Sequence, residues 1–227
     1  MRPMRSHATG GTDASSFVTL RFMSGPKAEA TRLEGLWAGG FGNAYVARNP
    51  VDVELRARFW KTLLTGHPIR SVLEVGCGQG GNLSLIAQLI DPRDVWGIDV
   101  NAEALNRARV SVPNANTVLG VARRLPFRDG LVDLAFTVGV LIHQPESTLP
   151  LVMSEIVRCS RRYVLWVEYF AEQTEEVPYH GETGTLYRRD YGRVYRELFP
   201  ELVVLGEGFL GREEGFDRGT WQLLEKP

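Results

Sequence analysis

The chain has 227 residues, a formal net charge of −1 and 44% hydrophobic residues, which together predict one domain with an ordinary apolar core. The near-neutral charge supplies no basic surface for a nucleic acid, and no apolar run is long enough to cross a bilayer. We therefore expect neither a nucleic-acid nor a membrane partner. Two cysteines, Cys77 and Cys159, are too few for a disulfide framework and predict a cytoplasmic protein.

The N-terminal residues differ in character from the rest. Residues 1–27 contain several arginines but lack the central apolar stretch of a secretory signal, and we interpret them as a disordered extension. Residues 28–227 are expected to form the domain, with residues 28–66 as an N-terminal helical cap. Within that cap we expect, in order, a helix over 28–37, a compact aromatic segment over 41–49 and a helix over 50–64.

From residue 71 onward, strand-like and helix-like segments alternate. Strands are predicted over 71–76, 95–100, 117–121, 132–138, 163–167, 201–209 and 219–225. Helices are predicted over 83–90, 102–109, 148–159 and 191–199. This order predicts an α/β, Rossmann-like single domain: a seven-stranded, mostly parallel sheet with a C-terminal antiparallel hairpin and helices on both faces. The polar stretch 172–189 is long for a loop, which favours a functional role.

The most informative segment spans residues 71–82, where an apolar strand enters a glycine-rich turn that opens a helix. This arrangement lets the backbone approach a nucleotide-like ligand at a helix N-terminus. The next strand ends at Asp99, whose carboxylate is placed to accept hydrogen bonds from two ribose hydroxyls. The two features together predict a cofactor that contains adenosine.

Two cofactor classes fit this glycine pattern. A dinucleotide fingerprint is satisfied by Gly76, Gly78 and Gly81, with Asp99 about 20 residues beyond. The E-x-G-x-G-x-G pattern of S-adenosyl-L-methionine-dependent methyltransferases is satisfied by Glu74, Gly76, Gly78 and Gly80. An acid inside the strand, a segment upstream that can cover the cofactor, and no second domain for a hydride-accepting substrate favour the methyltransferase. A dinucleotide remains the weaker alternative.

Ligands of such sheets bind at the carboxyl ends of the strands, so the loops after the first four strands are expected to hold the cofactor. Backbone groups of Ala122 and Arg123 are candidates for the adenine, and the Arg48 guanidinium suits a bidentate grip on the methionine carboxylate. The full set of candidate cofactor-binding residues is Glu74, Gly76, Gly78, Gly80, Asp99, Val100, Ala122, Arg123, Gly139, Tyr45 and Arg48.

Four further stretches resemble one narrower group. Residues 36–49, with the run LWAGGFGNAYVARN, are similar to the N-terminal motif of the pseudaminic acid biosynthesis-associated methylases. Residues 136–143, residues 163–170, and residues 187–192 followed by 198–200 are similar to that group too. The resemblance implies N- or O-methylation of a small polar acceptor, such as a sugar, an amino sugar or a nucleotide-linked sugar. The alternatives are a tailoring methyltransferase for another natural product, or a cofactor-binding protein without catalysis.

Two residues are candidates for the acceptor side. His143 follows the fourth strand and is the candidate general base; the alternative is a histidine that orients the next turn. Glu168 follows the fifth strand and is a candidate to bind an acceptor ammonium; the alternative is a solvated charge. We see no spacing typical of metal ligands and expect no metal. The small-molecule acceptor is the expected partner, bound by a monomer or homodimer.

Overall fold

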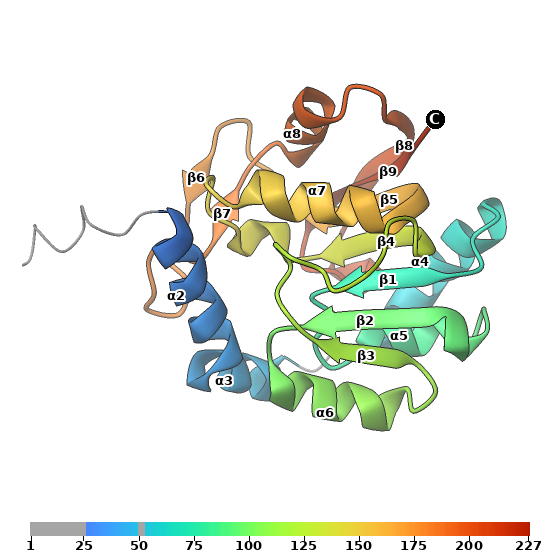
Figure 1. Cartoon of the computed structure of the whole chain (residues 1–227), viewed down its shortest axis with the longest axis horizontal. Coiled ribbons are helices and arrows are strands. Elements are labelled where there is room, and N and C mark those ends of the chain that lie inside the picture. Colours follow the sequence, from blue (N-terminus) through green and yellow to red (C-terminus); the bar gives the residue numbers. More distant parts are fainter. Residues whose placement is uncertain (1–25, 50–52) are drawn as a thin grey trace, which may run out of the picture.

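A computed structural model describes residues 26–49 and 53–227. Its main sheet has seven strands in the order β3-β2-β1-β4-β5-β9-β8 (Figure 1). The strands are β1 (Val72–Val75), β2 (Val95–Asp99), β3 (Asn116–Leu119), β4 (Val132–Val138), β5 (Ser160–Glu168), β8 (Val203–Leu210) and β9 (Gly219–Glu225). Pairing is parallel from β3 to β5, and β9 runs antiparallel to both β5 and β8, so the predicted fold class is confirmed.

The helices cover both faces of this sheet. They are α2 (Pro26–Ala38), α3 (Gly40–Arg48), α4 (Val53–Gly66), α5 (Gly81–Ile86), α6 (Ala102–Ser111), α7 (Leu149–Cys159) and α8 (Tyr191–Leu198). Short 3-10 helices are η2 (Pro92–Asp94), η3 (Leu141–His143) and η4 (Arg212–Glu214), and a separate two-stranded ribbon pairs β6 (Glu175–Glu176) with β7 (Tyr187–Arg188). None of the helices in the described part of the chain has the length and apolar character of a membrane span.

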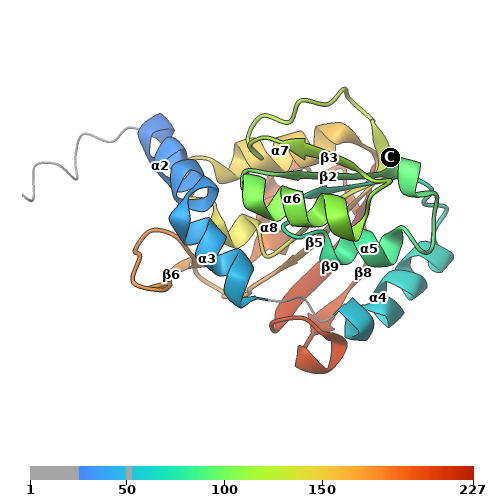
Figure 2. The same ribbon diagram turned by 90° about the horizontal axis from the view of Figure 1, so that it is seen from below.

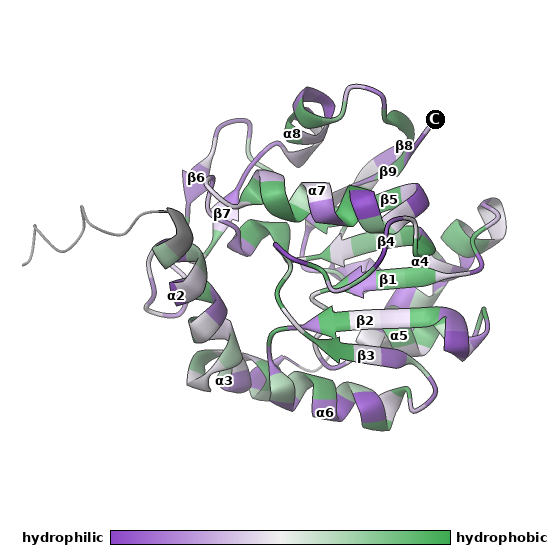
Figure 3. Cartoon of the chain, in the orientation of Figure 1, coloured by the Kyte–Doolittle hydropathy of each residue, from purple (hydrophilic) through white to green (hydrophobic). Residues whose placement is uncertain are grey.

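Two apolar layers sandwich the sheet. One layer is formed by α4, α5 and α6 through residues such as Trp60, Leu83 and Leu105, and the other by α7 and α8 through Met153 and Tyr195. Figure 2 shows the two sets of helices on opposite sides of the strands, and Figure 3 shows hydrophobic residues concentrated in the central strands. Since the central strands are buried on both faces, they read as nearly continuous apolar runs in the sequence.

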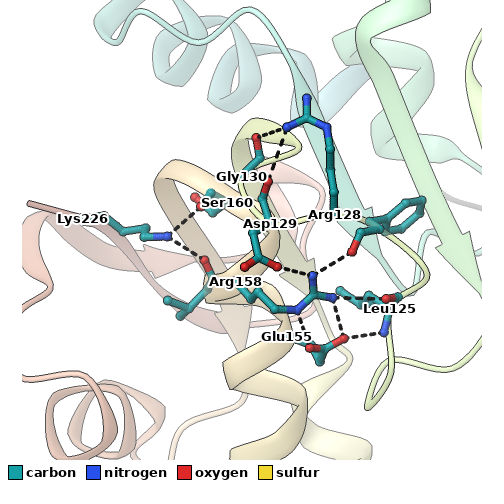
Figure 4. A network of polar contacts seen from close by, with 10 residues as sticks. Leu125, Arg128, Asp129, Gly130, Glu155, Arg158, Ser160 and Lys226 are labelled. Atoms are coloured by element: carbon teal, nitrogen blue, oxygen red, sulfur yellow. Dashed lines mark hydrogen bonds and ion pairs between the residues drawn. The ribbon is translucent and has the colours of Figure 1, made fainter.

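A polar network fixes the long connection between β3 and β4. Arg158, near the end of α7, binds Glu155 and Asp129 and donates to the backbone carbonyls of Leu125 and Phe127 (Figure 4). Glu155 also accepts from the Leu125 backbone N–H. Because one guanidinium satisfies several acceptors of an irregular segment, the loop is held in a defined path against α7.

The segment predicted as a compact aromatic stretch is a helix, α3, separated from α2 by Gly39. Its helical form depends on close packing: a Cβ at Gly42 would lie 1.8 Å from the Trp37 carbonyl oxygen, so only glycine permits this approach. The predicted start of the next helix, at residue 50, lies outside the described residues. That helix, α4, packs on α5 through Trp60, whereas α2 and α3 lie beyond the carboxyl ends of the strands (Figure 1).

Candidate active site

A cavity of about 280 Å³ opens at the carboxyl ends of β1, β2 and β4, beneath α2 and α3. It lies where the strand order reverses between β1 and β4, the usual ligand position in such sheets. The sequence-predicted residues that line it are Glu74, Gly76, Gly78, Asp99, Val100, Ala122, Arg123, Gly139, Tyr45 and His143. Three predicted residues do not line it: Gly80, Arg48 and Glu168.

The glycine loop shapes one wall of the cavity. Gly78 has φ of +52°, and a Cβ placed there would meet no atom within 4 Å, so its free side faces open space. A side chain at this position would be strained and would fill the space beside the loop. Gly80 faces away from the cavity, because a Cβ there would lie 3.1 Å from Ala108 on α6; its role is packing.

Asp99 joins the end of β2 to the glycine loop. One carboxylate oxygen accepts from the Gly78 backbone N–H at 2.8 Å, and the other accepts from the Asn101 backbone N–H at 2.8 Å. Burial raises the pKa of this carboxyl group above its usual value, and the backbone hydrogen bonds oppose that rise. Each oxygen keeps acceptor capacity, so the group can receive two further donors from a ligand.

Glu74 is 2% exposed and only half satisfied. Its Oε1 accepts from the Asn82 amide at 2.6 Å, while its Oε2 is buried without a partner. Burial raises the pKa of this carboxyl group to about 8. A buried carboxyl with an orphaned oxygen beside a cavity fits a ligand that brings a hydrogen-bond donor or a positive charge.

Arg56 is a cavity residue that the sequence analysis missed. Its Nη1 donates to Asn82 Oδ1 at 3.0 Å, and its Nε donates to the Gly215 carbonyl at 2.7 Å. The predicted Arg48 instead lies over the rings of Phe41 and Tyr45, at 5.7 and 5.9 Å from their centroids, and is exposed. The arginine that lines the cavity beside Asn82 is therefore supplied by α4, and no motif in the sequence distinguishes it from the other arginines.

The α2–α3 cap is fastened to the domain by polar contacts. Glu34 on α2 forms a bidentate pair with Arg123, at 2.5 and 3.0 Å, and this pair lies at the cavity wall. Asn101 donates to the Trp37 carbonyl at 2.9 Å, and Gln79 donates to the Val46 carbonyl at 2.9 Å. These contacts join the cap to the loops after β1, β2 and β3, so the cavity is covered on that side.

His143 ends η3 with its ring against the cap. Its Nδ1 lies 2.6 Å from the Thr185 carbonyl oxygen, which can only accept, so Nδ1 carries the proton and Nε2 carries the lone pair. The Trp37 ring centroid lies 4.4 Å from the imidazole centroid. Burial lowers the pKa of His143 to about 4. The side chain is therefore a neutral hydrogen-bond acceptor at neutral pH.

Glu168 occupies a different place from the one expected. It is 1% exposed, and its carboxylate accepts from the backbone N–H groups of Val140, Leu141 and Ile142 at 3.1 to 3.2 Å. The group therefore holds the start of η3 and does not face the cavity. Its neighbour Tyr169 does line the cavity. In the described ranges 26–49 and 53–227, no group of three or more His, Cys, Asp or Glu side chains is arranged to hold a metal ion.

Comparison with known proteins identifies the domain. Residues 72–162 match the family model described as a methyltransferase domain. This segment of the chain is therefore similar to methyltransferase domains. It contains the glycine loop, Asp99 and His143.

Curated relatives match only part of the chain. An uncharacterized methyltransferase from Synechocystis is 39% identical over 77 residues, which cover 34% of this chain and 35% of that protein. A fatty-acid O-methyltransferase from Mycolicibacterium smegmatis is 38% identical over 71 residues, covering 30% of this chain and 26% of that protein. The chain thus spans about a quarter to a third of the length of the curated relatives it matches.

Solved structures share the fold of the methyltransferase domain. The 1,6-didemethyltoxoflavin-N1-methyltransferase of Burkholderia thailandensis, solved with S-adenosylhomocysteine, has a TM-score of 0.69 at 14% identity, covering 90% of this chain and 91% of that one. The magnesium protoporphyrin IX methyltransferase of Synechocystis, solved with S-adenosylmethionine, has a TM-score of 0.64 at 13% identity, covering 88% and 97%. At these identities the likeness concerns the fold.

Proposed function

We propose that this protein transfers a methyl group from S-adenosyl-L-methionine to a small-molecule acceptor. The observation that carries the proposal is a single cavity that joins Asp99, the glycine loop and the half-satisfied Glu74 to a wall bearing His143. The family match to a methyltransferase domain and the cofactor-bound neighbours of the same fold support it.

The cofactor's groups find complementary partners among the lining residues. Asp99 would accept from the ribose hydroxyls, and the free oxygen of Glu74 would accept from the methionine ammonium. The Arg56 guanidinium at the cavity would face the methionine carboxylate, the role expected of Arg48. Backbone groups of Ala122 would form hydrogen bonds with the adenine. When bound, the cofactor supplies a methyl group that its sulfonium has already activated.

The protein's remaining work is alignment and proton removal. The cap and the aromatic residues along the cavity exclude water and hold the acceptor in line, which removes much of the entropic barrier. His143 Nε2, unprotonated because Nδ1 donates to Thr185, would take a proton from an attacking hydroxyl or from the methylated nitrogen. Glu168 would hold η3, and hence His143, in place.

The acceptor class is proposed more narrowly from the resemblance to sugar-associated methylases: a sugar, an amino sugar or a nucleotide-linked sugar. The relatives are named for other substrates, among them fatty acids and 24-methylenesterols, so their names do not support a sugar acceptor. A mass-spectrometric assay tests both the methyl transfer and the acceptor class. It uses S-adenosylmethionine with a panel of these sugars and a panel of natural-product acceptors. A methylated product establishes the reaction and the acceptor class. Cofactor binding without product in either panel would favour a non-catalytic role.

Replacing His143 with Ala tests the base. We expect kcat to fall by about 100-fold at saturating acceptor, the usual contribution of a positioned base, with S-adenosylmethionine affinity within about twofold of wild type. Assays of product formed over time measure kcat, and calorimetric titration measures the affinity for S-adenosylmethionine. The matched control is His67→Ala, since His67 packs beside Tyr163, away from the cavity. An unchanged kcat in His143→Ala would remove this residue from the mechanism.

A further inference from the structure

Beyond the cofactor's residues, one end of the cavity combines aromatic rings with a carboxylate. The rings are those of Trp37, Tyr45 and Tyr169, and the carboxylate is Asp217 in the connection between β8 and β9. The Trp37 and Tyr45 rings are 5.4 Å apart between centroids and stand at 82°, so they form two walls of a corner. The Tyr169 hydroxyl donates to Asp217 Oδ2 at 2.6 Å.

The Tyr169–Asp217 pair lines the same cavity as that corner. Burial raises the pKa of the Tyr169 hydroxyl, and the hydrogen bond to Asp217 raises it further. Burial is the main cause that raises the pKa of Tyr45; the positive charge of Arg56 lowers it, and the negative charge of Asp217 raises it. Tyr45, Tyr169 and Asp217 therefore belong to one electrostatic neighbourhood, although they come from α3, the end of β5 and the β8–β9 connection.

Besides the groups assigned to the cofactor, the cavity wall carries the acid Asp217, and Arg48 lies over the Tyr45 ring. Glu34 and Arg123 neutralise each other as a bidentate pair. Glu74, Asp99 and Arg56 are the groups assigned to the cofactor, and His143 is neutral because burial lowers its pKa to about 4. The remaining acidic side chain among the lining residues is Asp217.

The protein neutralises the negative charge of Asp217 only weakly. Its Oδ1 lies 3.7 Å from the Arg212 guanidinium, and both side chains are largely exposed, at 68% and 81%. Exposed pairs of this kind contribute little and are screened by salt. The faces of the neighbouring rings also carry partial negative charge, which attracts cations. A ligand cation at this position would gain both the carboxylate and the ring faces.

We infer that the acceptor carries a positively charged amino group, recognised by Asp217 and by the ring faces of Trp37, Tyr45 and Tyr169. This inference rests on the proposed function, because it names the substrate class of the same cavity. It moves ammonium recognition from Glu168, which is buried under η3, to Asp217, which is open to the cavity. The amino group is a recognition element, and the cation–aromatic contacts make it selective against neutral and anionic acceptors.

Three probes of matched size test the charge preference: benzylammonium, benzyl alcohol and benzoate. Each is titrated by NMR into the protein saturated with S-adenosylhomocysteine, the product form of the cofactor. We expect benzylammonium to bind about tenfold more tightly than either other probe, as one charge-assisted hydrogen bond and ring contacts would give. In Asp217→Asn the preference should fall to about twofold or less, with S-adenosylhomocysteine affinity unchanged.

The control variant is Glu213→Gln, which removes an exposed carboxylate on the adjoining η4 and should keep the full preference. Equal binding of the three probes, tighter binding of benzoate, or a preference that survives in Asp217→Asn would overturn the inference while leaving the cofactor site intact. Failure of S-adenosylhomocysteine to bind to the wild-type protein would overturn the proposed function, and the inference with it.

Discussion

Replacing Asp99 with Ala should weaken binding of S-adenosylmethionine by about 10- to 100-fold, because it removes a charged acceptor for two ribose hydroxyls. The loss has a second origin in the protein itself. Asp99 also accepts from the backbone N–H groups of Gly78 and Asn101, so the variant frees the glycine loop from the end of β2. Calorimetric titration of cofactor into wild-type and variant protein measures the effect.

Two controls separate these origins. Asp94→Ala removes an exposed acid in η2 that does not line the cavity, and it should leave cofactor affinity unchanged. Asp99→Asn keeps one carbonyl acceptor but no charge, and we expect it to fall between Asp99→Ala and wild type. Affinity within experimental error of wild type in Asp99→Ala would contradict the placement of the ribose, whatever the activity of the protein.

Much of the fold was predictable because central strands of a parallel sheet are buried on both faces. Their sequences are short and mostly apolar, and the predicted span 132–138 coincides with the parallel strand β4. The antiparallel strand β9 also coincides with its predicted span, 219–225. The start of α6 also follows from a local signal, since Asn101, directly before the helix, accepts from the Ala104 backbone N–H. The glycine loop and Asp99 were found because their chemistry requires a fixed local spacing.

The features that were missed depend on partners far away in the chain. The helix α3 forms from a glycine-rich sequence because Gly42 lets it pack against α2, a tertiary effect that helix propensity does not contain. Arg56 reaches the cavity because α4 lies beside α5 and η4. Arg58, two residues further along the same helix, has a similar local sequence context but is exposed. An acid at the end of a strand, such as Glu168, has the same sequence pattern whether its carboxylate faces solvent, a substrate or backbone N–H groups.

Glu168→Ala should lower the free energy of unfolding by about 3 kcal/mol, because three backbone N–H groups lose a buried acceptor. Those groups start η3, which carries His143 and follows the cavity residue Val140. The variant should therefore also lose kcat at temperatures where it remains folded, while its cofactor affinity changes less. Urea unfolding followed by fluorescence measures stability, and Glu146→Ala, an exposed acid three residues beyond His143, is the control.

Glu168→Gln distinguishes a positioning role from a charge required in the chemistry. Its amide oxygen can replace Oε1, which accepts from Val140 and Leu141, while the bond from Ile142 to Oε2 is lost. We expect stability about 1 kcal/mol below wild type at pH 5, and restoration of most of the activity lost in Glu168→Ala. A Gln variant as inactive as the Ala variant, yet stably folded, would return Glu168 to the list of groups whose charge matters.

The pH dependence of stability provides an independent check on the same carboxyl. Burial raises its pKa in the folded protein to about 7, above the value in the unfolded chain, so folding favours the protonated form. The stabilising contribution of this group is therefore complete below the unfolded pKa and is lost as pH rises through about 7. Glu168→Gln has no such titration. The stability of wild type relative to Glu168→Gln should consequently fall between pH 5 and pH 8, far enough for Glu168→Gln to become the more stable protein. A relative stability of wild type that rose over this range would mean that the three backbone donors outweigh burial and keep the carboxylate ionised.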